Sequence, residues 1–264
     1  MRFSIITVNY NDAVGLKKTI DSIAFQTFTN YEHIVIDGGS SDGSLDIIKR
    51  NADKFSFWSS EYDEGTYDAM NIGVRHAHGD YINFMNAGDV FHSSETLEVI
   101  NSKLDDVDIV TGNSFMPEIN KLYINPYKEL TLLTLLKHPL SHQSIFYKRN
   151  LFDRHCFDTN LKMMADFKLN LEAIVFNDCS VKIIDDIVSD FDVNGISSEN
   201  PVLYHMELQK ILNEFFPRRV IVDYQMMNTP EEIPLIELLP QLRKTNRIQK
   251  WVYKLAKVLL KILR

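Results

Sequence analysis

The chain has 264 residues, of which 45% are hydrophobic, 11% aromatic and 24% charged, as in an ordinary soluble globular protein. This composition excludes disordered and fibrous classes, and the two cysteines, Cys156 and Cys179, are too few for a disulfide framework. The net charge of −8 argues against a nucleic acid partner, because an acidic surface repels the phosphate backbone. The sequence shows neither a membrane-spanning apolar run nor a signal-peptide pattern, so we expect a cytoplasmic protein.

The first hundred residues alternate between short apolar runs and segments with helical periodicity. The runs Phe3 to Val8 and His33 to Ile36 are β-branched and bounded by turn residues, as expected of strands buried on both faces. Between them Asn11 or Asp12 can cap a helix. Its apolar positions are Val14, Leu16, Ile20, Ile23 and Ala24. The same alternation predicts a helix near 44–50, a strand near 55–58, a helix near 67–77, and strands at 81–85 and 107–111.

This order of strands and helices predicts an α/β fold with a mostly parallel sheet and helices on both faces. In such sheets ligands bind beyond the carboxyl ends of the strands. After about residue 115 the alternation weakens, although strands are expected at 123–126, 145–147 and 181–184, and a helix at 163–176. The residues of that helix expected to face inward are Phe167, Leu169, Leu171, Ile174 and Val175. This half is expected to complete the sheet and to form the second wall of a cleft.

Three aspartates follow predicted strands and would face the same edge of the sheet: Asp37, Asp63 and Asp89. Each alone is more often a turn or cap residue, but three at equivalent places can bind a ribose or base edge, or hold a divalent cation. The glycine-rich turn from Asp37 to Gly43 lacks the dinucleotide spacing, and no phosphate loop ending in Gly-Lys-Ser is present. NAD and ATP chemistry are therefore disfavoured.

Four blocks of sequence stand in order along the chain. They are Ser4–Asn11 (SIITVNYN), Ile34–Ser44 (IVIDGGSSDGS), Glu64–Gly73 (EGTYDAMNIG) and Gly79–Asp89 (GDYINFMNAGD). Together they resemble the inverting family 2 glycosyltransferases, most closely bacterial enzymes of colanic acid and related surface polysaccharide assembly. The resemblance covers about residues 1 to 190. It implies a GT-A fold, which is Rossmann-like, with a helical extension at the C-terminus.

The resemblance also implies a division of the chain into three parts. Residues 1–115 would form the half that binds the nucleotide sugar, and residues 116–200 the acceptor-side half of the same domain. Residues 201–264 would form the helical extension. On the nucleotide side, the matching positions are Thr7, Asn9, Asp37 and Asp63.

Asp68 and Asn71 lie on one turn of the predicted helix at 67–77, where they can form hydrogen bonds at the nucleotide edge, whereas Tyr67 and Met70 are expected to pack. In the family an Asp-x-Asp-like motif holds Mg2+ or Mn2+ against the diphosphate. This chain reads Asn86-Ala-Gly-Asp89, so Asp89 is the expected metal ligand and Asn86 a supporting residue. A divalent cation also answers a physical requirement, because an anionic diphosphate enters an acidic pocket only when charge is neutralised.

Inverting transfer needs a carboxylate that deprotonates the acceptor hydroxyl. Asp166 matches the family's catalytic aspartate, and the predicted helix N-terminus beside it favours the ionised form. His142 and Gln143, before the strand expected at 145–147, resemble a family element near the donor or acceptor and are given a supporting role.

The end of the chain differs from the rest in charge. Residues 243–264 hold eight of the 28 Lys and Arg and none of the 36 acidic residues. Basic residues recur there every three or four positions: Arg247, Lys250, Lys254, Lys257, Lys261 and Arg264. With Trp251 and several aliphatic residues between them, they are typical of a basic amphipathic helix on an anionic membrane surface. A surface helix that packs on the acidic body, or pairs two chains as a homo-oligomer, stays open.

The sequence thus predicts metal-dependent transfer of a sugar, with inversion, from a nucleotide diphosphate donor to a saccharide acceptor in polysaccharide biosynthesis. We expect a lipid-linked acceptor and a peripheral position on the inner face of the cell membrane. One alternative is a degenerate, non-catalytic binding subunit, which the reduced metal motif keeps open. Another is a sugar nucleotidyltransferase, although Thr7 to Val14 lacks the glycine-rich, basic phosphate loop that such an enzyme needs.

Overall fold

The computed structural model describes residues 1–191 and 200–228. It divides into two compact units, Met1–Leu208 and Gln209–Arg264, each of which is considered by itself. The first unit contains the sheet and all the predicted site residues. The C-terminal part is helical, with α8 (Pro201–Phe215) and α9 (Arg218–Asn228). The basic tail predicted at 243–264 lies outside the described residues.

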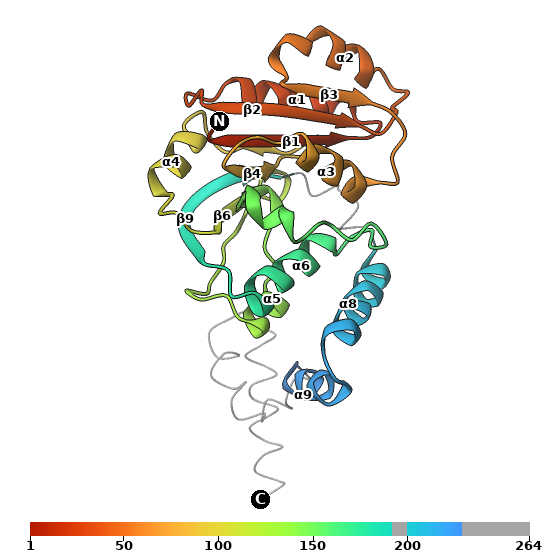
Figure 1. Cartoon of the computed structure of the whole chain (residues 1–264), viewed down its shortest axis with the longest axis vertical. Helices are drawn as coiled ribbons and strands as arrows, with labels where there is room; N and C mark the ends of the chain where they lie inside the picture. The colour runs from red at the N-terminus through yellow and green to blue at the C-terminus, as the bar shows by residue number, and fades with distance from the viewer. Residues whose placement is uncertain (192–199, 229–264) are drawn as a thin grey trace, which may run out of the picture. The chain divides into compact units, whose positions relative to one another are not determined.

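Four parallel strands form the N-terminal part of the sheet. They are β1 (Phe3–Asn9), β2 (Tyr31–Asp37), β3 (Phe57–Ser60) and β4 (Tyr81–Phe84), in the spatial order β3-β2-β1-β4. The connecting helices are α1 (Ala13–Ala24), α2 (Ser44–Arg50) and α3 (Thr66–Arg75). Figure 1 shows α1 and α2 on one side of these strands and α3 on the other. The predicted α/β arrangement is therefore confirmed.

Packing of the helices follows the apolar pattern, with two exceptions. Leu16 and Ile20 of α1 pack with Ile48 of α2 against Val35 of β2. Val14 and Ala24, predicted at apolar positions of the same helix, are exposed, Val14 to 84%. The cap is Asp12, whose side chain accepts a hydrogen bond from the Gly15 N–H.

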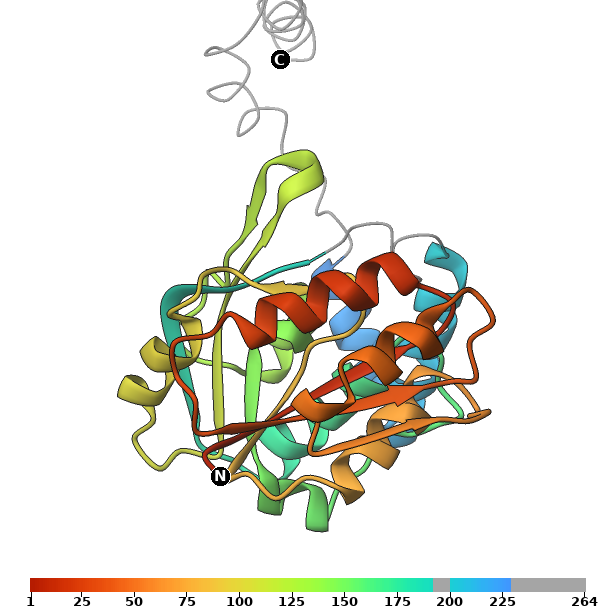
Figure 2. The ribbon, with the colours of Figure 1, turned by 90° about the horizontal axis from the view of Figure 1, so that it is seen from above.

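The second half of the sheet is mixed. β8 (Ile145–Lys148) lies antiparallel between β4 and β6 (Ile109–Met116), and β9 (Val181–Asp190) runs parallel to β6. β5 (Val90–Phe91) closes this edge, and β7 (Lys121–Tyr123) pairs with β6 in a hairpin that extends away from the sheet in Figure 2. The helices here are α4 (Thr96–Lys103), α5 (Leu132–Lys137) and α6 (Ala165–Asn170), and α6 continues as a π-helix (Leu171–Phe176). Short 3₁₀ turns span Ala52–Lys54, Pro117–Ile119, His142–Ser144 and Arg149–Asp153.

Several predicted boundaries were wrong. β3 begins two residues later than expected because Phe55 packs into the α1–α2 core instead of pairing. β6 continues past Thr111 because the polar Asn113 and Ser114 are buried inside the sheet. The strand expected at 123–126 is β7, which ends at Tyr123, and β9 runs beyond Ile184. Val175, expected to face inward, is half-buried. The elements β5, α4 and α5 were not predicted.

One core cluster joins both halves of the sheet, with Phe3, Tyr81, Val110, Phe146 and Val188 among its members. Both cysteines are free thiols. Within the residues that the structure describes, no helix is both long and apolar enough to cross a membrane.

Candidate active site

The carboxyl end of β2 carries a hydrogen-bonded cluster around Asp37. The Asn9 amide donates to Asp37 Oδ1 at 2.6 Å, and the Ser40 hydroxyl donates to the same oxygen at 2.5 Å. Asp37 Oδ2 accepts from the Ser60 hydroxyl at 2.6 Å and from the Ser40 N–H at 3.0 Å. The side chain of Asp37 is fully buried, so a base edge that donates to it has to displace one of the serine hydroxyls.

These bonds decide the charge of Asp37. Burial acts to raise its pKa, but hydrogen bonds from Ser40, Ser60 and Asn9 outweigh burial and hold the pKa below its usual value. Asp37 is therefore ionised at neutral pH, and it fixes the turn between β2 and α2.

Asp63 has a different environment at the same edge. Its Oδ1 accepts from the Gly65 N–H at 2.8 Å, while its Oδ2 lies against Gly38, where an added Cβ would approach to 2.8 Å. Burial raises the pKa of Asp63, and the charges of Asp68 and Asp37 raise it further. The ring of Tyr10, a residue that is 70% exposed, lies at the same place, where an added Cβ would approach Tyr10 Cδ2 to 3.2 Å. Gly38 itself is buried, and the Asp63 carboxyl group and the Tyr10 ring occupy the space beside it.

The loop after β4 is organised from α1. The buried Thr19 hydroxyl donates to the carbonyls of Asn86 at 3.1 Å and Asp89 at 2.7 Å, and it accepts from the Gly88 N–H at 3.1 Å. The Asp89 side chain is 6% exposed. Thr19 therefore fixes the backbone of the segment that was predicted to bind the cation.

A series of side-chain contacts joins this loop to the predicted base. Asn86 Nδ2 lies 3.1 Å from His142 Nε2, and His142 Nδ1 lies 3.3 Å from Asp166 Oδ2. The Tyr67 hydroxyl donates to Asp166 Oδ1 at 3.1 Å. When the Asn86 amide donates to Nε2, the proton of the neutral ring is on Nδ1 and points to Asp166. The structure thus brings Asp166, from α6, next to the end of β4.

The carboxylates near His142 shift its pKa upward. Burial would lower its pKa, but the hydrogen bond and charge of Asp166, with the charge of Asp89, raise the pKa above its usual value. Tyr67 stays neutral, because burial and the charge of Asp166 raise the pKa of its hydroxyl well above the usual value. Its role as a hydrogen-bond donor to Asp166 is therefore stable across physiological pH.

Other predicted residues are engaged elsewhere. Thr7 is fully buried with its hydroxyl 3.0 Å from His33 Nε2, and burial lowers the pKa of His33 to about 3. Asn71 exchanges two hydrogen bonds with the backbone of Phe157, at 2.9 and 3.0 Å. Both residues hold elements together and are not brought to the Asp37 or Asp166 clusters.

Asp68 and Gln143 also make local contacts. Asp68 Oδ2 accepts from the Glu64 N–H at 3.1 Å, so it holds the loop before α3. Gln143 Oε1 accepts from the Ser141 hydroxyl at 2.7 Å, and the Gln143 carbonyl accepts from Asn83 at 3.0 Å.

Four residues of the site were not singled out from the sequence or were read as packing residues: Thr19, Ser40, Ser60 and Tyr67. A hydroxyl on the apolar face of a predicted helix was the signal that could have indicated Thr19. Tyr67 was assigned to packing, and it does stack on Phe157, with ring centroids 5.5 Å apart, but it also binds Asp166. Nothing local in the sequence indicates that second contact, which depends on α3 meeting α6.

The 86–89 loop carries oxygen atoms that suit a hard divalent cation, if phosphates of a bound substrate supply further ligands. Among the described residues, no group of three His, Cys, Asp or Glu side chains is placed to hold a metal alone. Asp89 supplies a carboxylate, and Asn86 Oδ1 is a buried oxygen without a hydrogen-bond partner. Mg2+ and Mn2+ accept such oxygen ligands, and Mg2+ commonly takes the rest from phosphates and water.

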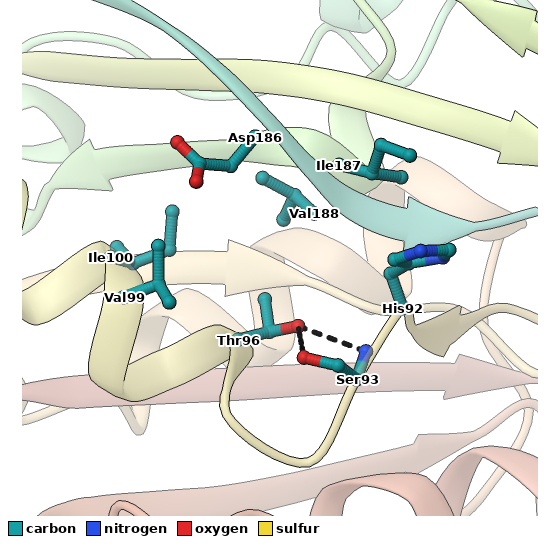
Figure 3. A pocket seen from close by; sticks show the side chains of 8 residues that line it. All are labelled: His92, Ser93, Thr96, Val99, Ile100, Asp186, Ile187 and Val188. Atoms are coloured by element: carbon teal, nitrogen blue, oxygen red, sulfur yellow. Dashed lines mark hydrogen bonds between the residues drawn. The ribbon is translucent and has the colours of Figure 1, made fainter.

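A separate cavity of about 220 Å³ lies between α4 and β9, away from these residues. Figure 3 shows its lining, with Val99, Ile100 and Val188 beside the hydrogen-bonded pair Ser93 and Thr96. A second hollow of about 320 Å³ is lined by residues such as Asp108, Arg154 and Cys179. Neither includes a residue of the Asp37 or Asp166 clusters.

Comparison with known proteins gives a consistent result. The model of a family described as glycosyl transferase family 2 matches residues 4–162. An uncharacterized glycosyltransferase of Mycobacterium tuberculosis is 30% identical over 203 residues, which are 74% of this chain and 76% of that protein. A PGL/p-HBAD biosynthesis glycosyltransferase of Mycobacterium bovis is 34% identical over 176 residues, 64% of this chain and 68% of the relative.

Solved structures of low sequence identity share the fold. TarS of S. aureus matches 81% of this chain with a TM-score of 0.67 at 21% identity, and the chain spans only 39% of TarS. The mannosyltransferase PcManGT from Pyrobaculum calidifontis, in complex with GDP-Man and Mn2+, gives a TM-score of 0.59 at 21% identity over 71% of this chain and 56% of that one. The glucosyl-3-phosphoglycerate synthase of Mycobacterium tuberculosis, with Mn2+ and UDP, gives 0.55 at 15% identity over 80% and 79%.

Proposed function

The chain belongs to glycosyl transferase family 2, and we propose that it transfers a sugar from a nucleotide diphosphate to a saccharide hydroxyl with inversion at the anomeric carbon. The hydrogen-bonded series from Asn86 through His142 and Asp166 to Tyr67 carries this proposal. It sets a carboxylate suited to act as a base beside the loop suited to hold the diphosphate, although the two are far apart in the sequence.

The nucleotide would bind at the carboxyl ends of β1 to β3. The exposed ring of Tyr10 would offer a face on which a base stacks, and Asp63, which meets Tyr10 at Gly38, would offer an acceptor. Asp37, held by Asn9 and the serines, fixes the turn and accepts from the base edge once a serine hydroxyl moves aside. Complexes of structural neighbours with UDP, UDP-GlcNAc and GDP-Man agree with such a donor class.

The transfer would be a single displacement. Asp166 takes the proton of the acceptor hydroxyl, the acceptor oxygen forms a bond to the anomeric carbon, and the bond from that carbon to the diphosphate oxygen breaks. The Tyr67 hydroxyl and the His142 ring fix the orientation of both Asp166 oxygens. A divalent cation held by Asp89, with the Asn86 oxygen nearby, would neutralise charge on the departing diphosphate.

The acceptor would be a lipid-linked glycan at the cytoplasmic face of the membrane. This part of the proposal is based on the basic pattern of residues 243–264, which would bring the chain to an anionic surface.

The substitution Asp166→Asn tests the assignment of the base. It removes the proton acceptor but keeps an oxygen for the Tyr67 hydroxyl, so we expect kcat to fall about 10² to 10⁴-fold. The donor dissociation constant should stay within about threefold, because the donor residues lie on other elements. Steady-state kinetics and calorimetric titration of the donor measure the two quantities.

Asp153→Asn is a matched control, since Asp153 is exposed and lies outside both clusters.

The donor is identified before these kinetic measurements, from the thermal stabilisation of the protein by UDP, GDP, CMP and their sugars with and without Mn2+. A ligand at about 100 times its dissociation constant adds about 2.7 kcal/mol of stability, which is readily measured. Absence of stabilisation by every nucleotide, or full activity in Asp166→Asn, would contradict the proposed function.

A further inference from the structure

Glu207 of α8, which is not among the predicted site residues, accepts three hydrogen bonds from backbone N–H groups. Its side chain is buried, with 6% of its surface exposed. Its Oε1 accepts from the Lys162 N–H at 2.7 Å, and its Oε2 accepts from the N–H groups of Met163 at 2.9 Å and Met164 at 3.0 Å. A buried carboxylate is costly unless it is hydrogen-bonded, and here three backbone donors satisfy it.

The three donors come from the segment that leads into α6. Met164 is the N-cap residue of α6, and its side chain makes no capping hydrogen bond. Of the amides that Glu207 binds, that of Met164 belongs to the N-cap residue, and the other two lie in the chain that leads into the helix. Glu207 therefore holds the entry to α6 from another helix. Asp166 follows in the first turn of α6, two residues after the last amide that Glu207 holds.

The same segment is tied on its other side. Lys162 Nζ donates to the Glu64 carbonyl at 3.0 Å, next to the loop that carries Asp63. This bond anchors only the first residue of the segment. The next two residues, Met163 and Met164, are held through their backbone N–H groups by Glu207. Without Glu207, those two N–H groups would be buried without their acceptor.

We propose that Glu207 is a positioning residue for the transfer reaction: it holds the start of α6 so that the Asp166 carboxylate meets Tyr67 and His142. The inference rests on the proposed role of Asp166 as base. It also assigns a function to α8, which lies beyond the residues 4–162 that match the family model. A displacement of a catalytic group by about 1 Å costs on the order of 10²-fold in rate, so a clamp at this place acts on kcat.

Two variants of the full chain test the clamp, with one control on the same helix. Glu207→Ala removes both oxygens, and we expect kcat to fall about 10²-fold while the donor dissociation constant stays within about threefold. Glu207→Gln keeps one acceptor oxygen, so its kcat should lie between those of Glu207→Ala and the native chain. Glu214→Gln, the same chemical change at an exposed position of α8, should leave kcat within about twofold.

Amide hydrogen exchange gives a readout that needs no substrate. In the native chain the amides of residues 162–164 should be protected, and in Glu207→Ala they should exchange at least about tenfold faster, with β1 and β2 unchanged. Unprotected native amides, or a native kcat in Glu207→Ala, would overturn the clamp. A chain that binds and transfers no nucleotide sugar at all would overturn the proposed function instead, and hydrogen exchange alone would then decide whether the clamp exists.

A variant that loses protection throughout the sheet is unfolded, and the milder Glu207→Gln then decides. Native-like protection at 162–164 together with a native kcat in Glu207→Gln would overturn the clamp.

Discussion

Asp37 and Asp63 lie at the same edge of the sheet, yet their surroundings shift the two pKa values in opposite directions. Burial acts to raise the pKa of both carboxyl groups. Around Asp37, bonds from two serines and an asparagine outweigh burial and keep the carboxylate ionised. Asp63 has one backbone donor, and the charge of Asp37 adds to the effect of burial. Asp63 is therefore the carboxyl group whose ionisation opposes folding.

We expect Asp63→Asn to stabilise the protein and weaken donor binding. Because the folded-state pKa of Asp63 is raised, its contribution to stability is greatest below the unfolded pKa and is lost as pH rises through the folded value. The variant should therefore have a higher Tm than the native chain at neutral pH, and the difference should shrink towards about pH 3. Asparagine keeps the acceptor for the Gly65 N–H.

Thermal melts of both proteins from about pH 3 to 8, with titration of the donor at neutral pH, measure the two effects. A functional residue that costs stability is the expected pattern at a binding site. A lower Tm for Asp63→Asn at neutral pH would show that the carboxylate stabilises the fold and would contradict this interpretation.

At the residue scale, the sequence could single out carboxyl groups but not the contacts that they make. Asp37, Asp63, Asp89 and Asp166 could be chosen because strand ends and family motifs mark them. The contact between the Thr7 hydroxyl and the His33 ring could not be anticipated, because the pattern of β1 does not tell which side chain of β2 meets Thr7. The roles of His142 and Tyr67 depend on contacts between distant elements, which no local pattern contains.

At the element scale, α3 packs so closely on β1 that residue 73 has no room for a side chain. A Cβ at Gly73 would lie 2.4 Å from Ile6 Cγ2. The approach brings the N-terminal turn of α3, with Tyr67, towards Asp166. The absence of a side chain at Gly73 thus allows the close packing of α3 on β1 that places Tyr67 beside the candidate base Asp166.

Gly73→Ala should destabilise the protein, although alanine favours helices. The gain in helix propensity is at most about 1 kcal/mol, whereas forcing a methyl group into a filled core costs about 1 to 3 kcal/mol. In an Ile6→Ala background the clash disappears, so the same substitution should become neutral or stabilising. Urea unfolding of the four proteins gives this double-mutant cycle, and an unchanged cost in the Ile6→Ala background would contradict it.

The elements that the sequence predicted best are those with regular burial. β1 and β4 are buried along their whole length and β2 in all but its first residue, and their apolar runs indicated them within a residue or two. β6 was cut short because Ser114 lies inside the sheet, where its hydroxyl contacts Ser144 and Ser189 at 2.5 and 3.1 Å. A polar residue satisfied by partners across the sheet looks, in sequence, like the end of a strand. β5, with two residues, is too short to have a period at all.

At the scale of the whole molecule, charge is divided between the body and the end of the chain. The described site gathers carboxylates, while residues 243–264 carry eight basic residues and no acidic ones. Separation of charge in this way lets an acidic enzyme approach an anionic membrane by one segment, because screening limits repulsion from the rest to about 10 Å at 0.1 M salt. A tail that instead packed on the acidic body would be neutralised by it.

A chain that ends at residue 242 separates these two interpretations. If the tail binds membranes, the shortened chain should no longer sediment with vesicles of anionic lipid, since each basic residue near the surface contributes about 1 kcal/mol of binding energy. The full chain should sediment with the vesicles at low salt and should be released as salt screens this attraction. Transfer to a soluble acceptor should be unchanged, because no predicted site residue lies in the tail. Equal sedimentation of both chains would contradict membrane binding, and a lower Tm of the shortened chain would indicate that the tail packs on the protein. Loss of transfer to a vesicle-borne acceptor alone would then connect the charge of the tail to the choice of substrate.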